Sequence, residues 1–367
     1  MRSRFLVPLL VLAVAAAAQT PAKKYNPPRM ADGHPDLQGT YDAATLTPLE
    51  RRSGTPLVMP KEEAAKQEAL AVAVKQQGDK AIDGDRAAPP KGGDGSPGPA
   101  GNVGGYNTGW LDTGSAYTVV DGQVRASIII DPPDGRTPPL VPGRKAGESA
   151  YNLNIVGFLQ ASLNAKPRPT SDQTESNDPG LERTPGAYDD PEARPLGERC
   201  LIGFGSTSGP PMLPNYFYNN NHQIVQTADH VMILTEMVHD ARIVRMNAQH
   251  LPKNIRLWLG DSVGHWEGDT LVVDTTNFTD KTAFRGSTPD LHVIERFTRE
   301  DAHTLLYRFT IDDPKTWTKP WTGEYSWPES KGPIYEYACH EGNYAMMDIL
   351  KGARIREKEQ AAKHGSK

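Results

Sequence analysis

The sequence has little cysteine, no excess of basic charge and few long apolar runs. Only Cys200 and Cys339 occur among its 367 residues. Beyond the N-terminus, no apolar run is long enough to cross a bilayer as a helix. The formal net charge is −5, from 40 basic and 45 acidic side chains, and the basic residues form no stripe. We therefore expect no nucleic-acid partner and no membrane association of the mature chain.

Short motifs that would name a reaction are also missing. The chain has no Gly-Lys-Ser/Thr phosphate-binding loop, no His-Glu-x-x-His or Cys-x-x-Cys metal motif, and no Gly-x-Ser-x-Gly elbow. In the nearest approach to that elbow, residues 205–209, the central residue is Thr207 instead of serine. We predict no cofactor. A metal site assembled from residues distant in the sequence is the alternative.

The N-terminus has the pattern of a secretory signal peptide. Arg2 and Arg4 precede an apolar stretch at residues 5–14, and Ala16 to Ala18 form a small-residue cleavage site. We predict that residues 1–18 are removed and that the mature chain is periplasmic or secreted. In such a compartment the two cysteines most simply form a disulfide, which would tie Cys200 to the last strand. Two free thiols or a pair of thiol ligands are the alternatives.

The remaining chain divides into two parts. Residues 19–105 are expected to form an extended arm over the surface, one helix and a flexible Gly/Pro-rich connection, whereas residues 106–367 form a β-rich domain with a C-terminal helix. The first helix is predicted over residues 60–77, with Pro60 in its first turn and alanines along its length. A hairpin is predicted over 118–132.

From residue 216 to 344, short apolar stretches alternate with turn residues. We predict strands at Ile224–Thr227, Val231–Val238, Arg242–Met246, Ile255–Trp266, Thr270–Phe278, Leu291–Thr298, Thr304–Ile311 and Ile334–His340. Short turns between successive strands indicate an antiparallel meander. Closing as a lipocalin-like barrel or a strongly curved sheet would protect the edges, and a two-sheet sandwich is the alternative.

Three carboxylates, Glu236, Glu295 and Glu336, lie on strand faces that are otherwise apolar. Because an unpaired buried charge is costly, each needs a partner or a raised pKa. Arg242 is one available partner. These groups either brace the sheet as structural ion pairs or line a ligand cavity inside it.

Two further groups combine acids and bases in short segments. His239, Asp240 and Arg242 lie at one strand end, and His340 and Glu341 lie beside Cys339. Either histidine could act as a general base, with a carboxylate as acid or orienting group and Arg242 as an anion clamp. Turn formation at Asp240 and a hydrogen-bonded structural histidine are the alternatives. The candidate catalytic residues are His239, Asp240, Glu295, His340 and Glu341, and the candidate substrate-binding residues are Arg242, Glu236, Tyr216, Trp258 and Glu336.

Aromatic residues also suggest two possibilities. Trp317, Trp321 and Trp327 cluster near the C-terminal end of the strand region. A tryptophan-rich rim could stack on sugars, but such residues more often fill a core.

Several segments resemble a family of exported bacterial proteins of unassigned activity that is widespread in soil bacteria. They are residues 35–39, 46–51, 254–262, 266–278 (WEGDTLVVDTTNF) and 336–346 (EYACHEGNYAM). The resemblance implies a secreted or periplasmic protein and carries no activity with it.

Two functions fit these observations. The first is an exported enzyme that performs acid–base chemistry, by hydrolysis or elimination, on a small organic or carbohydrate substrate in a barrel cavity. The second is a non-catalytic, lipocalin-like protein that binds a small ligand in the periplasm. We favour the enzyme because inward ionisable groups of both signs exceed what an apolar ligand would require.

Overall fold

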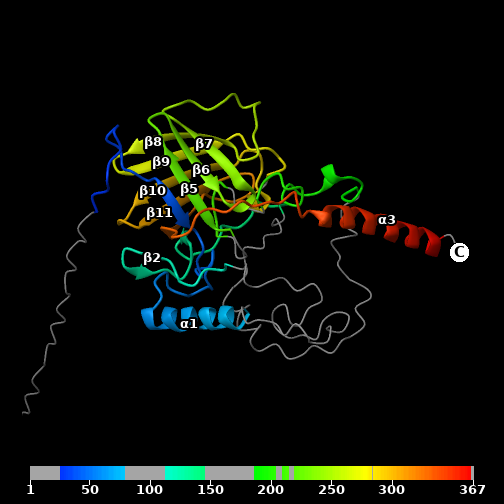
Figure 1. Ribbon diagram of the computed structural model, residues 1–367, viewed down its shortest axis with the longest axis horizontal. Helices are drawn as coiled ribbons and strands as arrows, with labels where there is room; N and C mark the ends of the chain where they lie inside the picture. Colours follow the sequence, from blue (N-terminus) through cyan, green and yellow to red (C-terminus); the bar gives the residue numbers. More distant parts are fainter. Residues whose placement is uncertain are drawn as a thin grey trace, which may run out of the picture.

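The main element of the fold is a strongly curved sheet of ten strands (Figure 1). The computed structural model describes residues 25–78, 112–144, 186–203, 209–214, 219–282 and 284–364. In spatial order the strands are β1 (Gly39–Asp42), β5 (Asn221–Gln226), β6 (His230–Thr235), β7 (Asp240–Met246), β8 (Asp261–Glu267), β9 (Thr270–Thr276), β10 (His292–Arg299), β11 (Thr304–Asp312), β12 (Trp321–Pro328) and β4 (Ile129–Asp131). The predicted mainly β fold with a strongly curved sheet is therefore confirmed.

The strands from β5 to β12 follow one another as a meander predicts, with one exception. β7 and β8 run parallel, with Val244 opposite Ser262. Parallel neighbours cannot be joined by a tight turn. Residues 247–260, here called the crossover loop, carry the chain back to the end where β7 began. The strand predicted from Ile255 consequently starts only at Asp261.

The ends of the curved sheet approach each other. Tyr41 of β1 forms a bridge with Glu329, just beyond β12, and the Ser330 amide donates to the Thr40 carbonyl over 2.8 Å. The segment expected to run over the surface as an arm instead contributes β1. It also supplies Leu37, which is fully buried like Tyr41. These apolar side chains explain why the segment enters the fold.

The last strand differs from the prediction. Residues 334–340 form no strand, and Glu336 and His340 in this segment are exposed. β12 is the last described strand, and the edge of β12 that faces away from β11 pairs with β4. Instead, the backbone amide of Tyr335 donates to the side chain of Glu236 over 3.0 Å.

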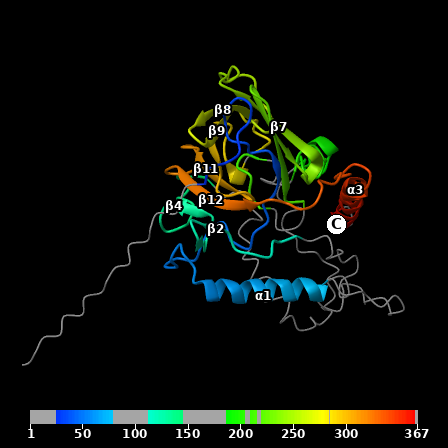
Figure 2. The same ribbon diagram turned by 60° about the vertical axis from the view of Figure 1, so that its left-hand side comes forward.

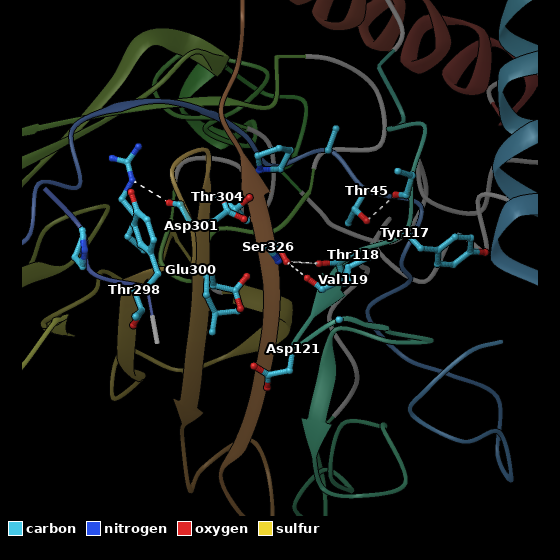
Figure 3. A pocket seen from close by; sticks show the side chains of 18 of the residues that line it. Thr45, Tyr117, Thr118, Val119, Asp121, Thr298, Glu300, Asp301, Thr304 and Ser326 are labelled. Carbon is cyan, nitrogen blue, oxygen red and sulfur yellow. Dashed lines mark hydrogen bonds between the residues drawn. The ribbon is translucent and has the colours of Figure 1, made fainter. Parts of the chain in front are cut away.

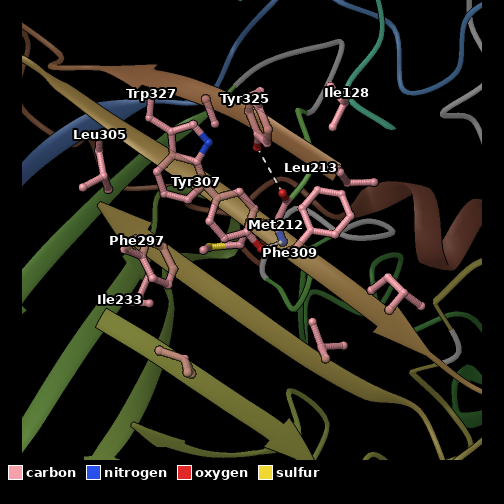
Figure 4. Packing of buried hydrophobic residues seen from close by; sticks show 14 of the residues in the cluster. Ile128, Met212, Leu213, Ile233, Phe297, Leu305, Tyr307, Phe309, Tyr325 and Trp327 are labelled. Atoms are coloured by element: carbon pink, nitrogen blue, oxygen red, sulfur yellow. Dashed lines mark hydrogen bonds between the residues drawn. The ribbon is translucent and has the colours of Figure 1, made fainter. Parts of the chain in front are cut away.

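Large aromatic side chains fill the inside of the curve (Figure 4). Those with at most 1% exposure are Trp321, Trp327, Tyr41, Tyr307, Tyr325, Phe297 and Phe309. The segment 209–214 adds Met212, whose amide donates to the Tyr307 hydroxyl and whose carbonyl accepts from the Tyr325 hydroxyl, both over 3.0 Å. The tryptophan cluster is therefore core, because Trp317 is also only 3% exposed.

In the described part of the chain, two α-helices and a small hairpin lie outside the sheet (Figure 2). α1 (Lys61–Gly78) confirms the predicted first helix and packs Ala64 and Ala71 against Tyr117 beside the hairpin of β2 (Val119–Val120) and β3 (Gln123–Val124). α3 (Tyr344–His364) is the expected C-terminal helix. Three short 3-10 turns are η4 (Pro191–Ala193), η5 (Met237–His239) and η6 (Phe284–Gly286). Neither described α-helix combines the length and apolar character needed to cross a bilayer.

The predicted disulfide between Cys200 and Cys339 is confirmed, with Cα atoms 5.7 Å apart. Its position differs from the expectation, because Cys339 lies in the irregular segment before α3 and not in a strand. The predicted signal peptide, residues 1–18, and most of the Gly/Pro-rich connection lie outside the described residues.

Candidate functional site

Glu295 and Arg242, two of the predicted site residues, form an ion pair inside the sheet. Glu295 on β10 is 0% exposed and Arg242 on β7 is 3% exposed. Both terminal nitrogens of Arg242 bond to the carboxylate, one of them over 2.9 Å. The Tyr307 hydroxyl donates to the same carboxylate over 2.8 Å. The Glu295 carboxylate accepts three hydrogen bonds and is fully buried. It therefore fits the alternative of a structural ion pair that braces the sheet.

His222 is a second buried polar residue inside the sheet, and its environment keeps it neutral. Its ring stacks on Trp327 with centroids 4.9 Å apart, and Nδ1 lies 3.0 Å from the Thr235 hydroxyl. Burial, together with the positive charge of Arg242, lowers the pKa of His222 to about 3. The imidazole is thus part of the rigid interior and not a proton shuttle at ordinary pH.

The strand-end group around His239 is divided, because Arg242 is buried inside the sheet whereas His239 is exposed to solvent. His239 is exposed in η5, and the Asp240 carboxylate accepts a bond of 2.8 Å from the Gly203 amide. Glu236 is buried and accepts from the Asn221 side chain over 2.8 Å, besides its bond from Tyr335. These two carboxylates fasten neighbouring loops, so their hydrogen bonds are those of structural groups.

The predicted residues near the C-terminus are not joined to the buried pair. Glu336, His340 and Glu341 are exposed in the segment before α3, whereas Glu295 is sealed within the sheet. Trp258 is 41% exposed in the crossover loop. Tyr216 lies outside the described residues. The structure therefore does not assemble the sequence candidates into one acid–base constellation.

A pocket of about 740 Å³ lies on the outer face of the sheet, and we call it the outer pocket (Figure 3). It is bounded by the β2–β3 hairpin and by outward-facing residues of β10 to β12, including Thr298, Leu306 and Ser326. These residues point outward because their strand neighbours, such as Phe297 and Trp327, fill the core. The alternation that builds the core thus also supplies the pocket wall.

Hydrogen bonds fix one wall of the outer pocket. The Ser326 amide donates to the Thr118 hydroxyl over 2.7 Å, and that hydroxyl lies 3.2 Å from the Ser326 hydroxyl. The Ser326 hydroxyl also bonds to the Val119 carbonyl. The hairpin is consequently held against β12, and the pocket is formed before any ligand arrives.

Glu300 is the titratable group of most chemical interest in the outer pocket. Burial, followed by the negative charges of Asp121 and Asp301, raises its pKa to about 7. Asp121 reaches the pocket from the β2–β3 turn, where it adopts a positive φ of 52° beside Gly122. Among the described residues, none donates a hydrogen bond to the Glu300 side chain. A half-buried carboxyl group with a pKa near neutrality is a typical candidate for a proton-transfer role.

Sequence reasoning missed Asp121 and Glu300, two of the carboxyl groups that line the outer pocket. In the sequence, Asp121 with Gly122 is a typical turn pair, and Glu300 lies between the predicted strands Leu291–Thr298 and Thr304–Ile311. They approach only because the hairpin packs on the outside of β12, and no local pattern encodes that contact. Within the described parts of the chain, no group of three or more His, Cys, Asp or Glu side chains is arranged to hold a metal ion.

Comparison of the chain with protein-family models, with curated proteins and with solved structures finds no match. The case for a function therefore depends on the geometry and electrostatics described above.

Proposed function

We propose that the protein is an exported enzyme that binds a small organic or carbohydrate molecule in the outer pocket and transforms it by acid–base chemistry, through hydrolysis or elimination. The observation that carries this proposal is the carboxyl group of Glu300, with its pKa near 7, facing a preformed pocket beside Asp121. Export is supported by the signal-peptide pattern and by the disulfide.

The two carboxyl groups would divide the work. Glu300 retains its proton up to about pH 7 and donates it to the leaving group. Asp121, as a carboxylate, accepts a proton from water or from the substrate. A general acid is most effective when its pKa lies near the working pH, and neighbouring carboxyl groups in different protonation states commonly share such roles. This pairing supports the proposed acid–base chemistry.

The lining of the outer pocket favours a neutral, hydroxylated substrate. Hydroxyl groups come from Tyr25, Thr45, Tyr117, Thr118, Thr298, Thr304 and Ser326. The hydroxyl protons of Thr45, Thr118 and Ser326 are used within the protein, but these oxygens keep lone pairs that can accept hydrogen bonds from sugar hydroxyls. Arg299 also lines the pocket, but its guanidinium bonds to the carbonyls of Asp36 and Ala302. Asp269 is paired with Arg29, whereas Asp121 and Asp301 add negative charge. An anionic substrate would therefore meet net repulsion.

The Glu300→Gln variant tests the proposal. On whichever substrate a panel of neutral glycosides and esters identifies, we expect kcat at pH 6 to fall at least about a hundredfold, because the amide keeps the shape but cannot supply the proton. The wild-type kcat should decline as the pH rises above about 7, since Glu300 then loses its proton. Glu192→Gln, at an exposed residue outside the pocket, is the control and should keep wild-type kinetics. Unchanged turnover in Glu300→Gln would remove this residue from the reaction.

Non-catalytic binding in the same pocket is the second candidate. It is favoured by the hydrogen-bonded wall of Thr118 and Ser326, because a rigid preformed site serves binding without turnover. A ligand that binds wild type and Glu300→Gln with the same affinity, and is recovered unchanged, would support this alternative.

A further inference from the structure

His250, in the crossover loop, lies between two carboxylates of the sheet. Its Nδ1 is 3.0 Å from Asp261 Oδ2 on β8, and its Nε2 is 3.2 Å from Asp274 Oδ1 on β9. Both distances are those of hydrogen bonds. The ring therefore connects the loop to two neighbouring strands.

This geometry requires a particular protonation state of His250. A neutral imidazole has one N–H and one lone pair, and only the imidazolium donates from both nitrogens. Both carboxyl groups are ionised at neutral pH. Burial opposes ionisation of Asp261, but bonds from the Leu251 amide, His250 and Arg245 outweigh it and lower its pKa. Bonds and charge from His292 and His250 likewise outweigh burial and lower the pKa of Asp274. A ring that carries a proton on both nitrogens can thus donate to both carboxylates.

Other charged groups around the ring extend this alternation of charge across the strands. Arg245 on β7 lies 2.8 Å from Asp261 Oδ1, and His292 Nε2 on β10 lies 2.9 Å from Asp274 Oδ1. The bond to Asp274 raises the pKa of His292 against the opposing effect of burial, and Asp312 on β11 raises it further. Positively and negatively charged side chains thus alternate across the strands. If the His250 ring is neutral, Asp261 and Asp274 lose the positive charge between them.

We propose that His250, Asp261 and Asp274 form a protonation-dependent clasp that holds the Leu251 amide in the first half of the crossover loop, residues 247–253, to the sheet. The bonds from the Asn247 amide to the Gly264 carbonyl (2.7 Å) and from the Asn277 side chain to the Leu251 carbonyl (3.0 Å) also hold this half and do not titrate. When the ring loses its proton, a lone pair faces one of the carboxylates and that contact becomes repulsive. The clasp then opens and its hold on the Leu251 amide loosens. The inference is independent of the outer pocket and its chemistry.

Leu251 is the backbone position most directly controlled by the clasp. Its amide donates to Asp261 Oδ2 over 2.8 Å, the same oxygen that His250 contacts. The second half of the loop is held differently, because the Leu257 amide donates to the Asn277 carbonyl over 2.9 Å. That backbone bond does not titrate. The two halves of the loop should consequently respond differently to pH.

The clasp works within a pH window. The aspartates have lowered pKa values, so the stabilisation from their ionisation is complete above the ordinary value of 3.8 and is lost at still lower pH. His292 has a raised pKa in the folded protein, so its contribution is complete below the ordinary value of 6.5 and is lost as the pH rises through the raised value. The His250 bridge likewise needs a protonated ring. Opening is therefore expected on the alkaline side.

Amide hydrogen exchange of the full mature chain, expressed as protection factors that correct for the intrinsic pH dependence, tests the clasp. From pH 5.5 to pH 8.5 we expect protection of the Leu251 amide to fall at least about tenfold, while that of Leu257 stays constant. In His250→Gln, Leu251 should be weakly protected at both pH values. In Asp274→Asn, the fall in Leu251 protection between pH 5.5 and pH 8.5 should likewise be smaller than in wild type.

His265→Gln is the matched control, because His265 also faces a carboxylate, 3.3 Å away on Glu267, but lies outside the clasp. The His265→Gln variant should show the same fall in Leu251 protection between the two pH values as wild type. Equal protection of wild-type Leu251 at both pH values would overturn the clasp, as would a wild-type step that persists in His250→Gln. Far-ultraviolet circular dichroism of each variant verifies that the sheet is intact.

Discussion

Replacing Glu295 with glutamine is expected to lower the free energy of unfolding by about 3–5 kcal/mol. The change leaves Arg242 only 3% exposed, still charged, and without its ionic partner. It also removes the charged acceptor of the Tyr307 hydroxyl. Removing one member of a buried pair is costly because the remaining charge stays out of water. Urea unfolding of wild type and variant at pH 7, followed by circular dichroism, measures the effect.

The matched controls separate the ion pair from charge in general. Glu336→Gln changes a carboxylate on the exposed segment before α3 and should stay within about 0.5 kcal/mol of wild type. The double variant Glu295→Gln with Arg242→Met should recover part of the loss, because no buried charge is then left unpaired. A loss below about 1 kcal/mol in Glu295→Gln alone would contradict the assignment of this pair as a buried brace.

Removing the disulfide is expected to have the second large effect. The bond joins residues separated by 139 positions, and the chain-entropy model gives about 5 kcal/mol for a loop of that length. Other contacts at this joint are few, among them a 2.8 Å bond from the Asn343 side chain to the Glu198 carbonyl. We expect the Cys200→Ser/Cys339→Ser double variant to lose about 4–5 kcal/mol in urea unfolding.

The single cysteine variants provide the check on this prediction. Cys200→Ser and Cys339→Ser should each lose about as much as the double variant, because either change removes the whole cross-link. Reduction of wild type with a thiol should reproduce the loss. A double variant as stable as the oxidised wild type would mean that the cross-link restrains little in the unfolded chain.

Much of the sheet could be predicted because its inward and outward residues alternate. In β10 and β11, buried residues such as Phe297 and Tyr307 alternate with polar ones, and this pattern is sufficient for a strand. β12 has the same period, with Trp321, Tyr325 and Trp327 inward, but Gly323 and flanking prolines obscure it. The sequence alone therefore indicates a tryptophan cluster more readily than a strand.

Other features depend on contacts between distant segments. The parallel pairing of β7 with β8 follows from the path of the crossover loop, which contains no helix that would signal a parallel connection. The strand predicted at 334–340 is absent from the structure, and β4 pairs with the edge of β12 instead. In both cases a local pattern was compatible with several pairings, and tertiary packing selected one.

The candidate site, too, could be predicted only in part from local sequence patterns. Sequence patterns correctly marked Glu295 as an inward carboxylate and Arg242 as a possible partner, yet they could not distinguish a brace from a ligand site. Burial decides this, because at most 3% of either residue is exposed and their bonds are made within the sheet. Glu300 and Asp121 gave no signal, since their proximity arises from packing of the hairpin against the outside of the sheet.

The central claim is that a carboxyl group poised near neutral pH faces the outer pocket. Carbon-13 NMR titration of the side-chain carboxyl groups, with Glu300→Gln to assign the resonance, tests it without any knowledge of the substrate. We predict a midpoint for Glu300 of about 7, which should move downward in Asp121→Asn because a neighbouring negative charge is removed. A midpoint at the ordinary glutamate value of 4.5 would contradict the account and leave the outer pocket without its acid.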